Sequence, residues 1–234
     1  MKIIISGMVG VGKSTISENL YNYFIKNNNR NLKIGFLKEL QFENPYLDFF
    51  YKERCEWSFL IQIDFLLERY KKLIIEDKKN NDITIFDRHF LDDYIFANSD
   101  SIKEDITNIH LNIYLELNKY LSSTISENDR PDYFFLLKAE YNEIINRINK
   151  RGRSFEKSSD LNKYWKSMYK VYYENKLVQE YLLRNTKNFI IIDANKSEKE
   201  ILNEILDILN SKNLWISRLI REKNKNLDFK FLKY

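Results

Sequence analysis

Short, almost uniformly apolar runs recur along the chain, separated by longer stretches that mix apolar and polar residues. An apolar run of about 4–8 residues without a polar face is typical of a strand buried on both sides in a parallel sheet. The sequence therefore predicts five buried strands, at Ile3–Ser6, Lys33–Lys38, Ile83–Phe86, Tyr133–Lys138 and Phe189–Ile192.

The stretches between these runs carry apolar residues three or four positions apart, as Ile16, Leu20 and Phe24 do in the first of them. This spacing places apolar side chains on one face of a helix. Strands that alternate with helices indicate an α/β fold with a parallel, doubly wound sheet flanked by helices. One domain is expected over residues 1–210, with a helical extension over residues 211–234. Helices are predicted at Ser14–Lys26, Trp57–Asp77, Asp105–Ser122, Glu140–Lys150, Tyr164–Leu183 and Lys199–Leu209.

Composition narrows the class of protein. The 234 residues include 38 basic and 34 acidic side chains, a net charge of +4 that does not indicate a nucleic-acid-binding surface. The single cysteine excludes a disulfide within the chain and fits a reducing compartment. The residues before Gly7 are too few for a signal peptide, and no apolar run is long enough to span a membrane. We expect a cytoplasmic protein with neither a membrane nor a nucleic-acid partner.

Three of the five glycines lie close together between the first predicted strand and the first predicted helix. The segment GMVGVGKS, residues 7–14, matches the phosphate-binding pattern G-x-x-x-x-G-K-[ST] at every fixed position. Glycines let successive backbone N–H groups face a phosphate, and the helix N-terminus adds partial positive charge. The pattern predicts bound ATP, with Lys13 at the β- and γ-phosphates and the Ser14 hydroxyl on Mg²⁺. The residues expected around the phosphates are Gly7, Met8, Val9, Gly10, Val11, Gly12, Lys13, Ser14 and Thr15.

Charged residues follow the second and third predicted strands. Glu39 ends the second strand, and Asp87 and Arg88 end the third. Ligands of an open parallel sheet bind at the carboxyl ends of its strands, the edge that also holds the glycine loop. We expect Glu39 to accept the proton of a substrate hydroxyl and Asp87 to hold Mg²⁺, directly or through water. Arg88 is expected to meet the transferring phosphoryl group or the attacking oxygen.

A cluster of arginines ends the fourth predicted helix. Arg147 and Arg151 are four positions apart and share a helix face, and Arg153 follows Gly152, which should end the helix. Arginines beside a flexible joint are typical of a lid that closes over a polyphosphate and excludes water. The sequence therefore predicts an arginine-rich lid over about residues 147–160, which contacts the nucleotide.

With these motifs in place, residues 1–210 resemble the deoxyribonucleoside kinases, the family of deoxycytidine, deoxyguanosine and mycoplasma deoxyadenosine kinases. The segment KELQFENPY, residues 38–46, is similar to the family's E-P-V-E-E-N-P-Y region, with Leu40 in place of proline. The first glutamate of that region is the general base, a role that falls on Glu39. The resemblance also implies that Tyr51 contacts the sugar 3′-hydroxyl and that Gln62 reads the edge of the base.

Two further motifs carry the resemblance. Asp87-Arg88-His89 resembles the family's [ED]-R-S, whose arginine contacts the 5′-hydroxyl and the phosphoryl group; its acidic residue is assigned to metal binding or to proton acceptance. The segment RSFE, residues 153–156, is similar to the lid sequence R-S-E-E, which implies that Glu156 binds the 3′-hydroxyl. The family's P-loop kinase fold is then expected, and a homodimer is implied.

Arg69 and Asp93 bear on the choice of base. Arg69 is seven positions after Gln62, and Asp93 is six positions after Asp87. Family members that act on deoxycytidine, deoxyguanosine or deoxyadenosine carry an arginine and an aspartate at the same spacings. Asp93 can accept a hydrogen bond from an exocyclic amine, and Arg69 can donate to a ring nitrogen or carbonyl. We therefore expect a purine deoxynucleoside or deoxycytidine to be preferred over thymidine.

Two other functions remain open from the sequence. Thymidylate kinases carry a similar D-R-[YH] motif, so a nucleoside monophosphate kinase is the main alternative. The acceptor segment, residues 39–48, contributes Glu39, Glu43 and Asp48 but no basic residue, which favours an uncharged nucleoside over a monophosphate. A regulatory or nucleic-acid-remodelling ATPase would need a separate partner surface. The expected activity is phosphorylation of the 5′-hydroxyl of a deoxynucleoside in nucleotide salvage.

Overall fold

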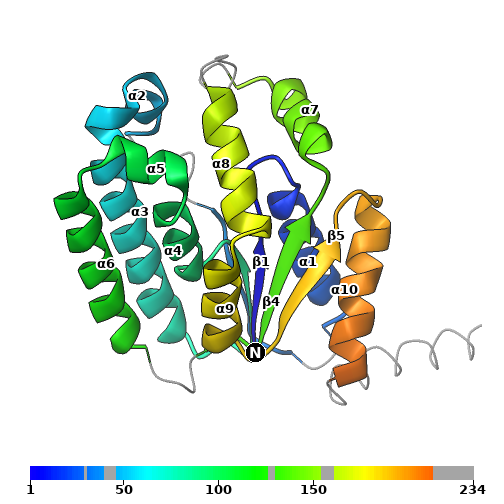
Figure 1. Ribbon diagram of the computed structural model, residues 1–234. Helices are drawn as coiled ribbons and strands as arrows, with labels where there is room; N and C mark the ends of the chain where they lie inside the picture. Colours follow the sequence, from blue (N-terminus) through cyan, green and yellow to red (C-terminus); the bar gives the residue numbers. More distant parts are fainter. Residues whose placement is uncertain (29–30, 40–45, 126–129, 154–160, 213–234) are drawn as a thin grey trace, which may run out of the picture.

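A five-stranded parallel sheet forms the centre of the molecule, with the strand order β2-β3-β1-β4-β5 (Figure 1). The computed structural model describes residues 1–28, 31–39, 46–125, 130–153 and 161–212. All five predicted strands are confirmed, with bounds within one residue of those expected. They are β1 (Lys2–Ser6), β2 (Ile34–Leu37), β3 (Ile83–Asp87), β4 (Tyr133–Lys138) and β5 (Phe189–Asp193).

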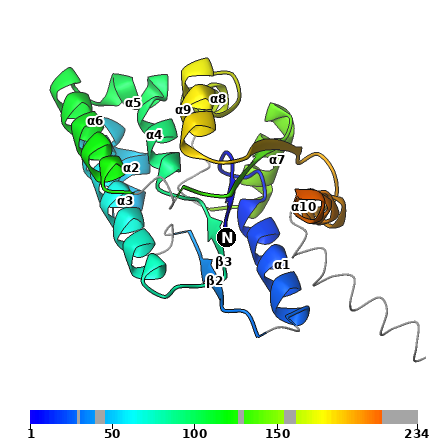
Figure 2. The ribbon, with the colours of Figure 1, turned by 90° about the horizontal axis from the view of Figure 1, so that it is seen from below.

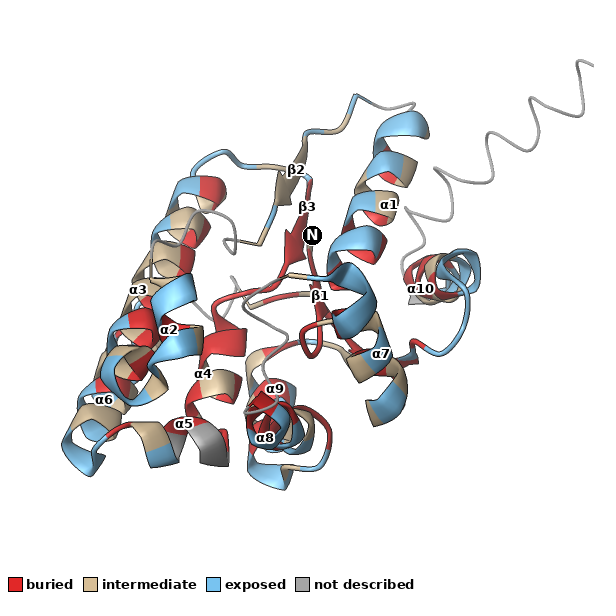
Figure 3. Cartoon of the chain, turned by 90° about the horizontal axis from the view of Figure 1, so that it is seen from above, coloured by how far each residue is buried: buried red, intermediate tan, exposed pale blue. Residues whose placement is uncertain are grey.

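The central position of β1 follows from its apolar sequence. Ile3, Ile4 and Ile5 are completely buried, with β3 paired on one side and β4 on the other. Figure 3 shows β1 and β3 buried between the flanking helices. The register sets Ile5 beside Asp87, so the loop that leaves β1 begins next to the carboxyl end of β3.

Helices cover both faces of the sheet, as expected for a doubly wound fold. Figure 2 shows α1 and α10 packed on one side, with α3, α4, α6, α8 and α9 on the other. In the described part of the chain, no helix is both long and apolar enough to cross a membrane. The helices are α1 (Lys13–Lys26), α2 (Leu47–Lys52), α3 (Arg54–Asp77), α4 (Leu91–Ala97), α5 (Asp100–Asp105), α6 (Asn108–Ser123), α7 (Tyr141–Arg151), α8 (Asn162–Tyr173), α9 (Lys176–Asn185) and α10 (Glu198–Lys212).

Two of the predicted helices are wrong in their extent. The stretch predicted as one helix over residues 105–122 is interrupted after α5, because Thr107 is extended and its side chain caps α6 by accepting from the His110 N–H. The stretch predicted over residues 164–183 divides at Asn175, whose side chain accepts from the N–H groups of Leu177 and Val178. At both positions a side chain caps the start of the next helix, and such a cap does not change the spacing of apolar residues.

Three helices were not predicted: α2, α4 and α5 contain only six or seven residues each. That is too short for a helical period to stand out from its surroundings. The end of α7 at Gly152 is confirmed, since this glycine has a φ of 79° and ends the helix. Part of the predicted lid (residues 154–160) and residues 213–234 of the predicted extension lie outside the described residues, as does Glu156.

Substitution of Gly7, the first residue after β1, tests whether close packing of the phosphate-binding loop adds to the cost of backbone strain. A Cβ at Gly7 would lie 2.6 Å from the Leu137 backbone oxygen, and its φ of 144° disfavours any side chain. Gly12 is the matched control, since its φ of 103° is also strained but a Cβ there meets nothing within 4 Å. Gly7→Ala should lower the free energy of unfolding by about 2–4 kcal/mol, and Gly12→Ala by about 1–2 kcal/mol. Urea unfolding of both variants measures the difference; equal losses would show that backbone strain alone decides the cost.

Candidate active site

The loop between β1 and α1 forms a cradle of backbone N–H groups. Gly10 and Gly12 have φ angles of 85° and 103°, in the left-handed region that side chains disfavour. The helix α1 begins at Lys13 with no side-chain cap, so its first N–H groups stay available for an anion. Tyr173 braces the loop from behind, because its hydroxyl accepts from the Met8 N–H at 3.1 Å and donates to the Leu137 oxygen at 2.8 Å. This geometry suits a polyphosphate.

A cleft of about 450 Å³ opens in front of this cradle. Its wall brings together residues from four separate parts of the chain: the glycine loop, the segment after β2, the end of β3 and the end of α7. The parallel strands end at one edge of the sheet, which is why these segments meet. The lining residues are Gly10, Gly12, Lys13, Ser14, Thr15, Glu18, Phe36, Lys38, Glu39, Asp87, Arg147, Arg151 and Arg153.

Lys13, Glu39 and Arg88 form a buried charge cluster at the back of this cleft. Lys13 Nζ lies 3.9 Å from Glu39 Oε2, and Arg88 Nε donates to Glu39 Oε1. Burial acts to raise the pKa of Glu39, but Arg88 and Lys13 together outweigh it and lower the pKa to about 2. Burial, and then repulsion by Arg88, lowers the pKa of Lys13 to about 8. At pH 7 Glu39 is therefore ionised, and Lys13 carries its charge in most molecules.

Asp87 and Ser14 offer oxygen atoms that suit a magnesium ion. Asp87 is 4% exposed and lines the cleft together with Ser14, while its Oδ1 atom has no hydrogen-bond partner among the described residues. Burial, and then Glu39, raises the pKa of Asp87, and a bound cation would oppose that shift. Mg²⁺ prefers oxygen ligands and is often held by one or two carboxylates together with substrate phosphates. In the part of the chain that the structure describes, no three His, Cys, Asp or Glu side chains form a cage for a metal. The site thus fits a metal that arrives with a nucleotide.

The three predicted lid arginines all line the cleft, but Arg147 is already engaged. It donates to the Val11 oxygen at 3.2 Å and to the Ala194 oxygen at 3.1 Å, and its Nε donates to Glu143 at 2.7 Å. Arg147 therefore links α7 to the phosphate-binding loop and to the loop after β5. Arg151 and Arg153 lie nearer the end of α7 and complete the basic wall.

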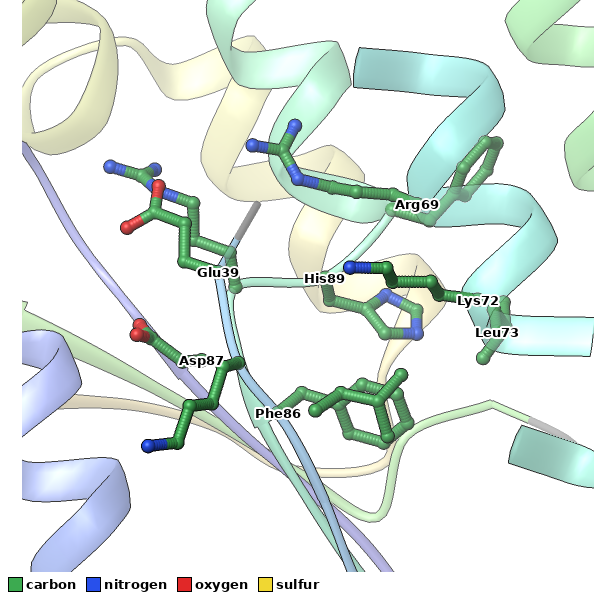
Figure 4. A pocket seen from close by; sticks show the side chains of 11 residues that line it. Glu39, Arg69, Lys72, Leu73, Phe86, Asp87 and His89 are labelled. Atoms are coloured by element: carbon green, nitrogen blue, oxygen red, sulfur yellow. The ribbon is translucent and has the colours of Figure 1, made fainter. Parts of the chain in front are cut away.

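A second cleft, with a volume of only about 20 Å³, lies on the other side of Glu39, toward α3. Figure 4 shows Glu39, Arg69, Asp87 and His89 among the residues that line it. Burial lowers the pKa of His89 to about 3, so its imidazole is neutral, and His89 Nδ1 accepts from the Leu91 N–H at 3.3 Å. His89 packs edge-on against Phe86 rather than facing the phosphate-binding cleft.

Arg69 and Asp93 join α3 to α4 through a buried ion pair. Arg69 Nη1 donates to Asp93 Oδ1, and the two side chains are 8% and 0% exposed. The Asp93 Oδ2 atom is buried and has no hydrogen-bond partner among the described residues. Burial raises the pKa of Asp93, and the contact with Arg69 opposes this shift. The pair thus retains one buried acceptor that a ligand could satisfy.

Tyr51 and Gln62 lie farther from the phosphate-binding loop. Tyr51 packs against Tyr164 and Trp165 of α8, with ring centroids 6.3 and 6.1 Å apart. Gln62 is buried on α3, seven positions before Arg69 and so on the same side of the helix. Neither residue is among those that line the two clefts. Lys13, Glu39 and Asp87 thus line one cleft together with the three predicted lid arginines. Gln62 and Tyr51 lie on α3 and α2, outside the lining of that cleft.

Asp92, Tyr172 and Tyr173 were not predicted as site residues. Asp92 is completely buried and contacts Arg88 Nη1 at 3.4 Å, and the Tyr172 hydroxyl accepts from the same nitrogen. The four-residue spacing from Arg88 to Asp92 was a weak signal, since Arg88 lies outside α4 with a φ of 67°. The tyrosines lie within an amphipathic helix and look like ordinary core residues.

Comparison with known proteins agrees with this geometry. A family model described as deoxynucleoside kinase matches residues 3–213. The deoxyadenosine/deoxycytidine kinase of Bacillus subtilis (strain 168) is 33% identical over 178 residues, which cover 74% of this chain and 75% of the relative. The deoxyguanosine kinase of Lactobacillus johnsonii (strain CNCM I-12250 / La1 / NCC 533) is 27% identical over 215 residues, 87% of this chain and 90% of the relative.

A solved structure gives the same result. The deoxyadenosine kinase from M. mycoides, with the products dCMP and a flexible dCDP bound, superposes with a TM-score of 0.74 at 29% identity. The match covers 90% of this chain and 100% of that chain, and it confirms the predicted P-loop kinase fold. Because the family match runs from β1 to beyond the end of α10, the chain belongs to the deoxynucleoside kinase family and is a deoxynucleoside kinase.

Proposed function

We propose that this kinase transfers the γ-phosphoryl group of ATP, in the presence of Mg²⁺, to the 5′-hydroxyl of a deoxynucleoside. The observation that carries the proposal is the shared cleft, where a phosphate cradle, an ionised Glu39 and a buried Asp87 face one another. The described lining adds the basic groups Lys13, Arg147, Arg151 and Arg153, which suit a polyphosphate.

In the proposed mechanism, the glycine loop and the N-terminus of α1 hold the polyphosphate, and Lys13 reaches its β- and γ-phosphates. The oxygen atoms of Ser14 and Asp87 are the ligands that this chain offers to Mg²⁺. When bound, the ion would neutralise charge on the phosphate oxygens. Arg151 and Arg153 would close the cleft from the end of α7, together with the rest of the predicted lid.

Glu39 is the proposed general base. It lies between Lys13 and Arg88, at the junction of the two clefts, and is ionised at neutral pH. Phosphoryl transfer through a loose transition state needs a well-placed acceptor of the proton more than a strong base. Arg88 and Lys13 would stabilise the charge that develops on the transferring group.

The acceptor side is assigned to the residues that the family resemblance singled out. Tyr51 and Glu156 are proposed to bind the sugar 3′-hydroxyl, and Gln62 to read the base edge. Arg69 and Asp93 are proposed to select the base, since the unpaired Asp93 Oδ2 can accept from the exocyclic amine of adenine, guanine or cytosine. Thymine has no such amine, so it would leave a buried acceptor unsatisfied, at a cost that can reach orders of magnitude in kcat/KM. The relatives named for deoxyadenosine, deoxycytidine and deoxyguanosine support this preference.

The direct test is a phosphorylation panel with the four deoxynucleosides and their monophosphates, with ATP as donor. Deoxyadenosine, deoxyguanosine or deoxycytidine should be the best substrate, thymidine should be poor, and the monophosphates should not react. Removal of Mg²⁺ with EDTA should abolish turnover, and its return should restore it. A preference for thymidine would contradict the role of Arg69 and Asp93, and a preference for dTMP would support a monophosphate kinase.

Glu39→Ala tests the assignment of the base. This variant should keep nucleoside binding within about threefold but lose about 10²–10⁴ of kcat, the range for removal of a general base. Steady-state kinetics and nucleoside titration separate the two effects. Glu76→Gln is the control, since Glu76 is also a buried carboxylate but bonds Asn81 and Lys79 at the far end of α3. Near-normal turnover of Glu39→Ala would move the role to Asp87.

We propose further that the enzyme is a homodimer, joined through an exposed stripe on α6. Ile109, Ile113 and Tyr120 are 71%, 50% and 68% exposed, and their spacings of four and seven residues place them on one face of α6. Three large apolar side chains in a row are an unusual surface for a monomer. A second copy of the chain would remove them from water.

Ile113→Lys tests this interface. The substitution should convert a dimer into a monomer at micromolar protein concentration, with little change in the melting temperature of the protomer. Light scattering coupled to size-exclusion chromatography measures the mass. Leu177→Lys on α9 is the control, since Leu177 is 68% exposed but lies on another helix, and this variant should remain dimeric. A wild-type protein that runs as a monomer would end the proposal.

A further inference from the structure

Arg88 lies in a backbone conformation that only strong surroundings maintain. Its φ of 67° is in the left-handed region, which is unfavourable for a side chain of this size. The Arg88 N–H donates to the Ile5 oxygen at 3.1 Å, which ties the residue to the end of β1. The side chain is 0% exposed, so every donor of the guanidinium must find a partner inside the protein or on a ligand.

The donors of Arg88 divide between two sides. Nε donates to Glu39, the proposed base. Nη1 donates to the Tyr172 hydroxyl and lies 3.4 Å from Asp92 Oδ1. Nη2 is buried and has no hydrogen-bond partner among the described residues. The two held sides fix the plane of the guanidinium, and with it the direction of Nη2.

The Asp92 carboxylate is itself held on both oxygens. Oδ1 accepts from the hydroxyls of Ser6 and Tyr172, the latter at 3.2 Å, and Oδ2 accepts from the His89 N–H at 2.9 Å. Asp92, Ser6 and Tyr172 are all 0% exposed. A buried carboxyl group with this many donors cannot rotate freely.

The two carboxylates on Arg88 differ in what the reaction does to them. Glu39 loses its negative charge when it accepts the proton of the substrate hydroxyl, so its attraction for Arg88 falls as the phosphoryl group moves. Asp92 takes no part in that proton transfer, so its contact with Arg88 is not altered by it. The guanidinium therefore has one partner that changes during turnover and one that does not.

We propose that Asp92 is a positioning residue, which holds the Arg88 guanidinium in place independently of Glu39 while the phosphoryl group is transferred, and so fixes its Nη2, which is unpaired among the described residues. Tyr172 bridges the two side chains and contributes to the same function. Ser6, at the end of β1, ties the carboxylate to the strand that leads into the phosphate-binding loop. The inference rests on the proposed role of Arg88 in phosphoryl transfer.

Asp92→Asn removes the charge and keeps the shape. We expect kcat to fall about 10–100-fold, because a displaced charge stabiliser costs on this scale, with KM for the nucleoside changed less than about threefold. Tyr172→Phe should lower kcat less, by about 3–10-fold. Glu76→Gln is the control for loss of a buried carboxylate: it should lower the melting temperature without lowering kcat. If Asp92→Asn does not fold, Tyr172→Phe carries the test.

A double-mutant cycle with Arg88→Ala distinguishes positioning from a purely structural role. In the Arg88→Ala background, Asp92→Asn and Tyr172→Phe should change kcat less than about twofold, because the group that they position is gone. If turnover of Arg88→Ala is too slow to measure, Arg88→Lys supplies the background. A kcat within twofold of wild type in the single variants, or the full loss in either Arg88 background, would overturn the proposal. Wild-type kcat in Arg88→Ala would instead refute the proposed role of Arg88.

Discussion

A buried positive charge at the carboxyl edge of the sheet constrains the rest of the active site. The Arg88 guanidinium is removed from water, which is costly unless ionised partners and hydrogen bonds replace the lost solvation. Glu39 and Asp92 supply carboxyl groups and Tyr172 supplies a hydroxyl, and they come from the segment after β2, from α4 and from α8. These segments must therefore close on the same point, and the backbone of Arg88 accepts a left-handed conformation to reach it.

The same edge concentrates charge of both signs before any nucleotide is present. Lys13 and Arg88 are positive, and Glu39, Asp87 and Asp92 are acidic, within a region that water reaches poorly. Burial, and then repulsion by Arg88, lowers the pKa of Lys13, whereas burial raises and the neighbouring cations more strongly lower the pKa of Glu39. A polyphosphate with its metal ion would add both negative and positive charge to this cluster, which is why the cleft suits phosphoryl transfer.

A second pair of buried charged groups lies between α3 and α4. The pair of Arg69 and Asp93 joins α3 to α4 beneath the second cleft, and it leaves one carboxylate oxygen unpaired among the described residues. A buried acceptor of this kind discriminates by the penalty for leaving it unsatisfied, rather than by the attraction of the correct base. The pair of Arg69 and Asp93 and the cluster of Lys13, Glu39 and Arg88 are thus two separate buried charge clusters near the same edge of the sheet.

The sequence by itself determined the five strands, the phosphate-binding loop and the charged residues at the strand ends. Each of these is a local pattern: an apolar run, a glycine spacing, or a charge next to a strand, and the geometry of a parallel sheet does the rest. A family resemblance also singled out Arg69 and Asp93, but the ion pair between them is found only in the structure. The helix breaks at Thr107 and Asn175 were not predicted, because a side-chain cap interrupts a helix without changing the spacing of its apolar residues.

The tertiary structure alone decided which buried polar groups meet. Ser6, Asp92 and Tyr172 are far apart in the chain, and Arg147 bonds the backbone of two loops that no spacing links to it. Such contacts depend on the register of strands and the packing of helices. Both are properties of the whole fold, so no local sequence pattern predicts them.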